Sequence, residues 1–346
     1  MRVVVVAPGH AFSTLDVYHG LCAGLTACGA TVHPYPLHDT LETMEVLVAA
    51  AQVANVAPSY PDPVLLATAG IPGYTMAKTA DWVLFVHGLN IPPSIPATLR
   101  RGGYRAAVLC TETPYQIAEE REMARWYDVA FTNERNHAGL FPFTRYVQHL
   151  AHAYDPAVHT PDGPSAPPCD VFFCGTRYPE RAALLDGVDW TGIDVCDRTL
   201  RVDADTPFEQ AARQILTNDV VAMHYRSARI SLNQHRTTQS VLDGGTIAPD
   251  SAWSLNPRAF EIPACGGFCV SDARADLPLL FGDSVPTYHD SESLERVIRY
   301  YLAHEDERRA LADRQRAAVL PHSWAARARQ VLDTLTAISA TPRIAA

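Results

Sequence analysis

Short runs of β-branched and aromatic residues alternate with helical patterns along the first half of the chain. The runs lie at residues 2–7, 31–37, 64–69, 82–87, 106–110 and 129–132. Between the first two, Leu21, Leu25 and Cys28 recur at helical spacing and predict a helix over residues 13–28. Strands that alternate with helices indicate a parallel sheet covered on both faces. The first half is therefore expected to form a doubly wound α/β domain.

A proline-rich segment separates this half from a second α/β pattern. Residues 155–170 contain five prolines and one glycine, which a helix or a central strand does not tolerate. Strands are then predicted at 171–174, 191–196 and 230–233, with helices from 179, around 208–216 and at 291–305. A last helix is predicted at 323–338, and its apolar side chains need a partner surface.

The chain length supports a division into two domains. With 346 residues, the chain exceeds the size at which a single core usually stops growing, about 250–300 residues. We expect an N-terminal domain at 1–160, a hinge at 161–168, a C-terminal domain at 169–320, and a crossing helix with a tail at 321–346.

Composition predicts a folded, cytoplasmic protein without a metal. Hydrophobic residues make up 47% of the chain and charged residues 19%. The apolar run at residues 3–7 is too short for a signal peptide or a membrane span. The eight cysteines form no C-x-x-C pair and lie mostly in apolar runs, so we expect reduced, buried thiols. Cys265 and Cys269 are the only close pair, and no metal site is expected there.

Residues 256–272 are the most informative segment for function. Glu261 stands in the first turn of a short predicted helix, where free backbone N–H groups also attract anions. Its carboxylate can accept hydrogen bonds from two vicinal ribose hydroxyls, and Gly266 and Gly267 would allow a ligand to approach the backbone. The pattern fits a nucleotide or nucleotide-sugar site. It also fits an ordinary helix-to-strand connection in which Glu261 offsets the helix dipole.

The charge pattern favours small phosphorylated ligands over a broad nucleic-acid surface. Net charge is −10, and Lys78 is the only basic residue that is not arginine. Arginine is suited to phosphate because its planar group binds two oxygens at once.

Several ordered segments resemble one family of enzymes. They are PGHAFSTLDVYHGL from residue 8, TETPYQ from 111, HAYDPAVHTP from 152, CDVFFCGTRYPERAALL from 169, SARISLNQHR from 227, NPRAFEIPACGGF from 256 and the YYLAHEDERRALA tail. In this order they resemble the CgeB-like (spore maturation type) glycosyltransferases and related actinobacteriophage enzymes of the GT-B fold.

The resemblance implies two Rossmann-like, doubly wound domains that face each other across a cleft, with the C-terminal helix packing back on the N-terminal domain. It implies transfer of a hexosyl or pentosyl group from a nucleotide sugar, with a UDP-sugar favoured, without a metal or cofactor beyond this co-substrate. The acceptor would be a protein or glycan hydroxyl, or a modified phage DNA base, in the host cytoplasm for a phage enzyme.

The resemblance also implies roles for the C-terminal residues. Glu261 matches the acidic residue that contacts the donor ribose, and Arg181 falls where related transferases place a phosphate-binding lysine. Arg177 and Arg258 are nearby candidates for the diphosphate, and Arg258 could instead pair with Glu261. Many retaining families carry a second glutamate at the position of Trp253, so the stereochemistry of transfer stays open.

Polar residues after predicted strands complete the candidate list. Asn233 and His235 follow an apolar strand and could contact the base or sugar. Gly9 and His10 follow the first strand, in a loop that resembles one that approaches donor phosphates.

Two N-terminal residues are candidates for the acceptor side. His87 follows the strand DWVLFV and is a candidate general base or hydrogen-bond donor, or a packed histidine. Glu112 in TETPY is the candidate acidic residue that faces the acceptor.

Four other interpretations are weighed against this one. An NAD-dependent oxidoreductase is disfavoured because no G-x-G-x-x-G turn follows the first strand. A non-catalytic nucleotide-sugar-binding protein would keep the fold without the activity. The Asp203-Ala204-Asp205 triplet is a formal metal motif, but it lies among turn-like residues. A DNA acceptor is disfavoured because residues 1–160 hold 9 basic and 13 acidic side chains.

Overall fold

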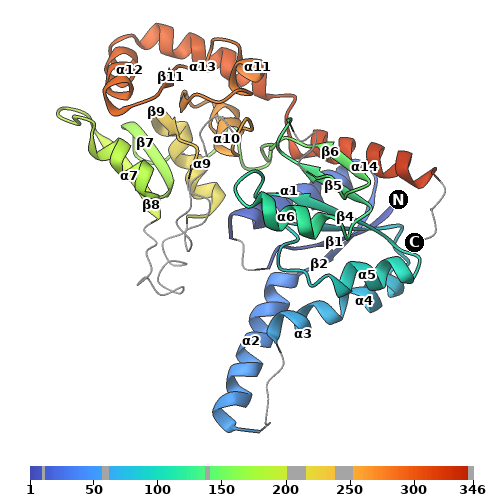
Figure 1. Cartoon of the computed structure of the whole chain (residues 1–346). Coiled ribbons are helices and arrows are strands. Elements are labelled where there is room, and N and C mark those ends of the chain that lie inside the picture. The colour runs from blue at the N-terminus through green and yellow to red at the C-terminus, as the bar shows by residue number, and fades with distance from the viewer. Residues whose placement is uncertain (10–11, 57–61, 137–140, 201–215, 238–251, 342–346) are drawn as a thin grey trace. The chain divides into compact units, whose positions relative to one another are not determined.

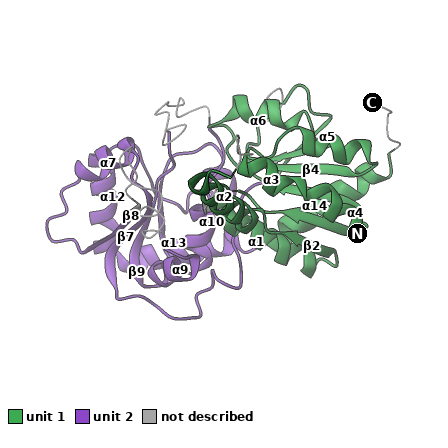
Figure 2. Ribbon diagram, turned by 90° about the horizontal axis from the view of Figure 1, so that it is seen from below, with its two compact units in different colours: residues 1–150, 324–346 green, residues 151–323 purple. Residues whose placement is uncertain are grey.

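A computed structural model describes the chain except for residues 10–11, 57–61, 137–140, 201–215, 238–251 and 342–346. The chain divides into two compact units (Figure 2). Unit 1 comprises Met1–Leu150 and Trp324–Ala346, and unit 2 comprises Ala151–Ser323.

Unit 1 is built on a parallel sheet with the strand order β2-β1-β3-β4-β5-β6 (Figure 1). Its strands are β1 (Arg2–Val6), β2 (Thr31–Tyr35), β3 (Trp82–Val86), β4 (Arg105–Cys110), β5 (Val129–Thr132) and β6 (Tyr146–His149). Its helices are α1 (Phe12–Ala27), α2 (Leu37–Ala54), α3 (Pro63–Ala69), α4 (Ile71–Ala77), α5 (Ser94–Arg101), α6 (Ile117–Ala124) and the last helix, α14 (Trp324–Ser339). The predicted doubly wound α/β class is confirmed for this unit.

One predicted strand of unit 1 is wrong. Residues 64–69 form the helix α3, although Val64 favours a strand and the run from Val64 to Leu66 is continuously apolar. The Asp62 side chain caps the helix by accepting a hydrogen bond from the Val64 N–H at 2.8 Å, and Pro63 occupies the first turn. A capped helix start with proline outweighs the β preference of Val64.

Unit 2 contains a second parallel sheet with the order β11-β10-β9-β7-β8. Its strands are β7 (Cys169–Thr176), β8 (Val195–Leu200), β9 (Ala228–Asn233), β10 (Cys269–Asp272) and β11 (Thr287–Tyr288). Its helices are α7 (Pro179–Asp186), α9 (Asn218–Ser227), α10 (Arg258–Ala264), α11 (Leu277–Phe281), α12 (Ser291–Ala303) and α13 (Glu305–Val319). The predicted helix at 208–216 falls almost entirely outside the described residues.

Alternate side chains of β7 enter two different hydrophobic cores. Phe172 belongs to one core, while Val171 and Phe173 belong to the other. Successive strand residues point to opposite faces, so the sheet of unit 2 is buried on both.

The segment before the predicted hinge belongs to unit 2. The Tyr154 hydroxyl donates to the Leu320 carbonyl at 3.1 Å, and the Tyr154 backbone N–H donates to the His322 carbonyl at 3.3 Å. Arg226 holds the proline-rich stretch by donating to the carbonyls of Thr160 and Pro164. These bonds place residues 151–168, including the predicted hinge at 161–168, inside the compact body of unit 2.

The C-terminal helix α14 packs on α1 within unit 1, as predicted. Two glycines of α1 make room for it, because a Cβ on Gly20 would collide with the Trp324 ring. A Cβ on Gly24 would lie 2.6 Å from the Trp324 carbonyl oxygen. At its other end, α14 accepts a hydrogen bond from the Trp82 indole through the Ser339 hydroxyl, at 2.9 Å.

A valine at Gly24 is expected to destabilise the protein by about 2–3 kcal/mol, because the new side chain meets backbone that cannot move aside cheaply. Thermal unfolding measures this change. Gly73→Ala is the matched control, since nothing lies within 4 Å of its Cβ position. The control should be neutral or stabilising by about 0.5–1 kcal/mol. Equal melting temperatures for the two variants would contradict the packing of α14 on α1.

Candidate functional site

The strand order of unit 2 marks one edge of its sheet as a ligand-binding position. From β7 the chain passes to β8 on one side and then to β9 on the other. In open parallel sheets, ligands bind outside the carboxyl ends of the strands at this reversal of order. The loops after β7 and β9 are therefore the expected place for a ligand.

Arg181 joins these two strand ends. Its guanidinium donates to the Thr176 carbonyl at 2.9 Å and to the Gln234 carbonyl at 2.7 Å. The residue is only 4% exposed, and burial, followed by the charge of Arg258, lowers the pKa of Arg181 to about 10. No carboxylate among the described residues lies within ion-pair distance of it. The site thus contains a buried cation whose protein partners are carbonyl dipoles.

Arg258 brings a second cation to the same place. Its Nε donates to the Cys174 carbonyl at 2.8 Å. A Cβ built on Gly175 would lie 2.5 Å from Arg258 Nη2 and 3.2 Å from Arg181 Nη1, so both guanidiniums lie against the backbone of Gly175. Two adjacent cations in a partly buried site attract an anion with several oxygens.

Glu261 lies in the first turn of α10, as predicted, with its side chain 12% exposed. Burial raises the pKa of Glu261 to about 7, although Arg258 opposes the shift. Its Oε1 lies 4.0 Å from Nε2 of His159. Nδ1 of His159 accepts the Asp155 N–H at 3.2 Å, so a neutral His159 ring directs its own N–H toward Glu261.

His159 was missed as a functional candidate. It lies in the proline-rich region that the sequence marks as a linker, and no local pattern connects it with Glu261, about a hundred residues later. Only the fold of unit 2 brings the two together.

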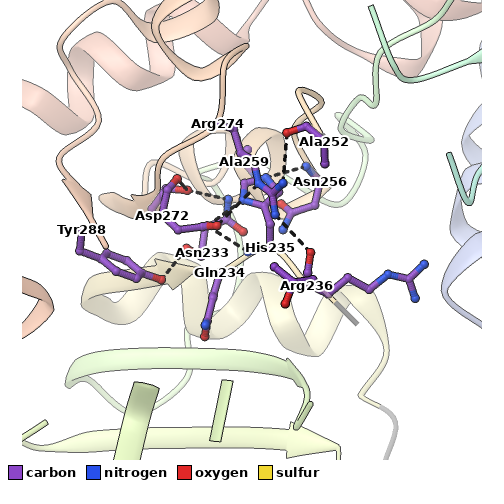
Figure 3. A network of polar contacts seen from close by, with 12 residues as sticks. Asn233, Gln234, His235, Arg236, Ala252, Asn256, Ala259, Asp272, Arg274 and Tyr288 are labelled. Atoms are coloured by element: carbon purple, nitrogen blue, oxygen red, sulfur yellow. Dashed lines mark hydrogen bonds and ion pairs between the residues drawn. The ribbon is translucent and has the colours of Figure 1, made fainter. Parts of the chain in front are cut away.

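His235 and Asp272 form the centre of a polar network at the same edge (Figure 3). Asp272 Oδ1 accepts the His235 backbone N–H at 2.9 Å and lies 2.7 Å from His235 Nδ1. His235 Nε2 accepts the Asn256 N–H at 3.2 Å, so the neutral ring carries its proton on Nδ1 and donates it to Asp272. Burial lowers the pKa of His235, against the opposing effect of Asp272. Burial alone would raise the pKa of Asp272, but His235 and Arg274 together lower it.

The predicted ligand contacts of Asn233 and His235 stay predictions, and both side chains already form hydrogen bonds within unit 2. Both ring nitrogens of His235 are used within the protein. The Asn233 side-chain amide donates to the Ser271 hydroxyl, and the backbone carbonyl of Asn233 accepts the Tyr288 hydroxyl at 3.0 Å. Through these hydrogen bonds, Asn233 and His235 connect β9 to β10, β11 and the loop before α10. They thereby hold the strand ends beside the site in place.

Arg177, another predicted phosphate ligand, is paired with carboxylates. Its guanidinium lies 2.7 Å from Asp186 and 3.7 Å from Asp197, beside a cavity of about 90 Å³. These two partners neutralise its charge, which the sequence could not show.

Gly266 and Gly267, where a ligand is predicted to approach the backbone, lie just after α10. They follow the last turn of α10, at the opposite end of the helix from Arg258. A Cβ on Gly267 would lie 2.7 Å from the Tyr225 carbonyl, so its close approach is to the protein's own backbone. Gly266 has a φ of +78° and continues the chain out of the helix.

The predicted residues of unit 1 lie at its own strand ends. Gly9 follows β1, where a Cβ would lie 2.9 Å from the Asn90 side chain. His87 follows β3 with a left-handed φ of +73°, a strained conformation for a side chain of this kind. Its Nδ1 lies 2.8 Å from the Thr111 hydroxyl, and burial lowers the pKa of His87 despite Glu112. His10 lies outside the described residues.

Glu112 is held by a buried carboxylate. Its backbone N–H donates to Glu120 Oε1 at 2.8 Å, and the same carboxylate accepts the Thr113 hydroxyl. His87 and Glu112 thus stand on neighbouring strand ends, β3 and β4, and influence each other electrostatically.

Within the described part of the chain, no three His, Cys, Asp or Glu side chains gather as a metal-binding set. The Asp203–Asp205 motif lies outside it. Among the same residues, no helix is long and apolar enough to cross a membrane.

Comparison with known proteins identifies the fold. The structure matches trehalose-6-phosphate synthase OtsA with a TM-score of 0.64 and 12% identity, over 99% of this chain and 100% of that one. It matches sucrose-phosphate synthase from Thermosynechococcus elongatus with a TM-score of 0.62 and 11% identity, over 98% and 99%. HepE of Anabaena, solved with UDP and glucose, gives 0.61 and 11%, over 97% and 99%.

The sequence comparisons concern the second half of the chain. No curated protein gives a significant sequence match. Residues 173–333 match a family model described as glycosyl transferase-like. The chain therefore has the GT-B fold of glycosyltransferases, and its residues 173–333 match the glycosyl transferase-like family.

Proposed function

We propose that the protein transfers a sugar from a nucleoside diphosphate sugar, with UDP-sugars favoured, to an acceptor hydroxyl. One observation carries the proposal. Arg181 and Arg258 lie together over Gly175 at the strand-order reversal of unit 2, without an ion-paired carboxylate among the described residues. UDP is favoured because HepE, which has the same fold, was solved with UDP and glucose.

The two arginines would bind the diphosphate. During transfer the acceptor oxygen bonds to the anomeric carbon, and the bond from that carbon to the phosphate oxygen breaks. The electron pair of this bond stays on the diphosphate, so its negative charge grows toward the transition state. Guanidinium groups already fixed by the Cys174, Thr176 and Gln234 carbonyls stabilise this charge without reorganising.

Glu261 would bind the ribose of the donor. Two hydroxyl hydrogen bonds favour the charged carboxylate over the neutral acid. Arg258 already acts in the same direction, against the burial that raises the pKa of Glu261. In this role Glu261 selects a ribonucleotide through its 2′- and 3′-hydroxyls.

His87 and Glu112 are proposed for the acceptor side. Burial lowers the pKa of His87, which keeps its imidazole neutral near pH 7 and able to take the proton that the acceptor hydroxyl loses. A protein or glycan acceptor is favoured, and a modified DNA base is the second candidate. We further propose that the transferred group is a hexosyl or pentosyl group and that the transfer needs no metal. We also propose that the protein is related to the CgeB-like and phage glycosyltransferases and acts in the cytoplasm.

A thermal-shift screen tests the nucleotide part of the proposal. Ligand at about 100 times its Kd adds about 2.7 kcal/mol of stability, which raises Tm by roughly 5 °C or more. We expect this shift with UDP and UDP-sugars, and an equal shift in the presence of EDTA. A shift with NAD(P) alone would instead establish an oxidoreductase on the same fold. Binding of UDP-sugar without release of UDP, with or without acceptors, would establish a non-catalytic binding protein.

A further inference from the structure

Helices α2 and α3 form an arm that extends from the sheet of unit 1 (Figure 1). They pack against each other, and α2 buries Leu37, Leu41 and Val48. The arm also exposes large apolar side chains to solvent. They are Val46 (65% exposed), Leu47 (56%), Val53 (90%), Val56 (70%), Leu65 (50%) and Leu66 (40%), which we call the apolar arm face.

The residues of this face that lie on α2 form one continuous surface. Val46 and Val53 are seven residues apart and Leu47 is adjacent, so the three lie within about one third of the helix circumference. A helix at a protein surface normally turns charged residues to solvent, and one that is apolar on all sides is normally buried. The second half of α2 is apolar on both sides, yet one side is exposed to solvent. A helix with this sequence is expected to have a packing partner on that exposed side as well.

After Glu45, the arm carries almost no charge. From residue 46 to residue 61 the sequence contains no charged side chain, and from 46 to 77 it contains only Asp62. By contrast, α13, another exposed helix, carries eight charged side chains within the sequence EDERRALADRQRAAV. The uncharged stretch is thus confined to the arm.

We propose that the apolar arm face is the interface through which two copies of this chain associate. A protein with a net charge of −10 repels its own copy, and an uncharged face is where two copies can meet at the least electrostatic cost. A twofold arrangement places the same face on both partners, so each apolar patch covers the other.

The exposed area is sufficient for a dimer. The six side chains expose on the order of 600 Å² per copy, so a pair would bury about 1,200 Å², at the lower end of stable interfaces. A lipid surface is the less suitable partner. Helices that lie on anionic membranes carry Lys and Arg beside the apolar face, whereas residues 37–77 contain neither.

Sedimentation velocity of the full chain, with and without charges on the face, tests this proposal. We expect the wild type to form a dimer at about 50 µM. Leu47→Glu/Val53→Glu should weaken association by about 100-fold or more, because two copies would bury four unpaired carboxylates. Both side chains are exposed, so the variant should keep the wild-type circular dichroism and melting temperature.

Gln52→Glu is the matched control. It adds one negative charge, half of what the double variant adds, to the same helix, on the side away from Val46 and Val53, and should remain dimeric. A monomeric wild type, or a dimer that persists in the double variant, would overturn the proposal. Flotation of a monomeric wild type with phosphatidylcholine vesicles, lost in the double variant, would overturn it too and assign the face to lipid.

Discussion

Replacing Glu261 with glutamine is expected to stabilise the protein at pH 8 while it weakens nucleotide-sugar binding. Burial raises the pKa of Glu261 to about 7 in the folded protein, against 4.5 for the unperturbed side chain. As pH rises from 4.5 to 7, the unfolded chain loses this proton before the folded one does. The contribution of Glu261 to the free energy of unfolding is therefore fully present below pH 4.5, and it is lost as the pH rises through 7.

The expected gain from Glu261→Gln at pH 8 is about 2–3 kcal/mol, and near pH 4.5 the two proteins should be equally stable. The gain arises because glutamine need not be charged in a site that is 12% exposed. The loss of binding arises because a neutral amide accepts ribose hydroxyls less strongly than a carboxylate does. Denaturant unfolding at several pH values, with calorimetric titration of UDP, measures both effects.

Asp272→Asn is the matched control for this experiment. The pKa of Asp272 is lowered in the folded protein, mainly through His235, so its carboxylate contributes stability that is present above pH 3.8 and lost as pH falls. Its replacement should therefore destabilise the protein at pH 8, opposite in sign to Glu261→Gln. Unchanged stability and unchanged UDP affinity in Glu261→Gln would show that Glu261 is an ordinary residue of the helix start.

The second large effect is expected from Arg258→Met. Methionine retains an apolar side chain against the Phe173 ring but removes one of the two cations beside Gly175. We expect the affinity for UDP to fall by roughly 100-fold, the usual scale for loss of one partner of a buried charge pair. Folding stability should change little, because Arg258 and Arg181 repel each other without a ligand.

Arg177→Met is the control for the loss of a positive charge near β7. Arg177 is paired with Asp186 and Asp197, so its removal should change UDP affinity by less than about threefold. A larger effect for Arg177 than for Arg258 would move the diphosphate to the other side of β7 and contradict the proposed site.

The fold could be predicted from sequence because its signals are local. Each central strand is a short buried run such as residues 82–86, which are all buried, and the intervening helices carry their own periodicity. The failure at 64–69 is also local, because a short apolar run fits either a buried strand or a helix, and the cap at Asp62 and Pro63 decides for the helix.

The site was predictable only in part. Glu261 could be predicted because the neighbouring residues indicate where α10 begins and therefore place Glu261 in its first turn. Arg177 and Arg181 look alike in sequence, and only the fold shows that one faces Asp186 and the other the Gln234 carbonyl. The roles of these residues in ligand binding remain predictions.

Calorimetric titration of UDP into the wild type and Arg258→Met, side by side, tests the central claim most directly. The claim is that the two arginines at the strand-order reversal of unit 2 bind a nucleoside diphosphate. It predicts one UDP per chain for the wild type and binding roughly 100-fold weaker for the variant. Equal affinity in the two proteins, or no heat of binding in the wild type with any nucleoside diphosphate, would contradict it.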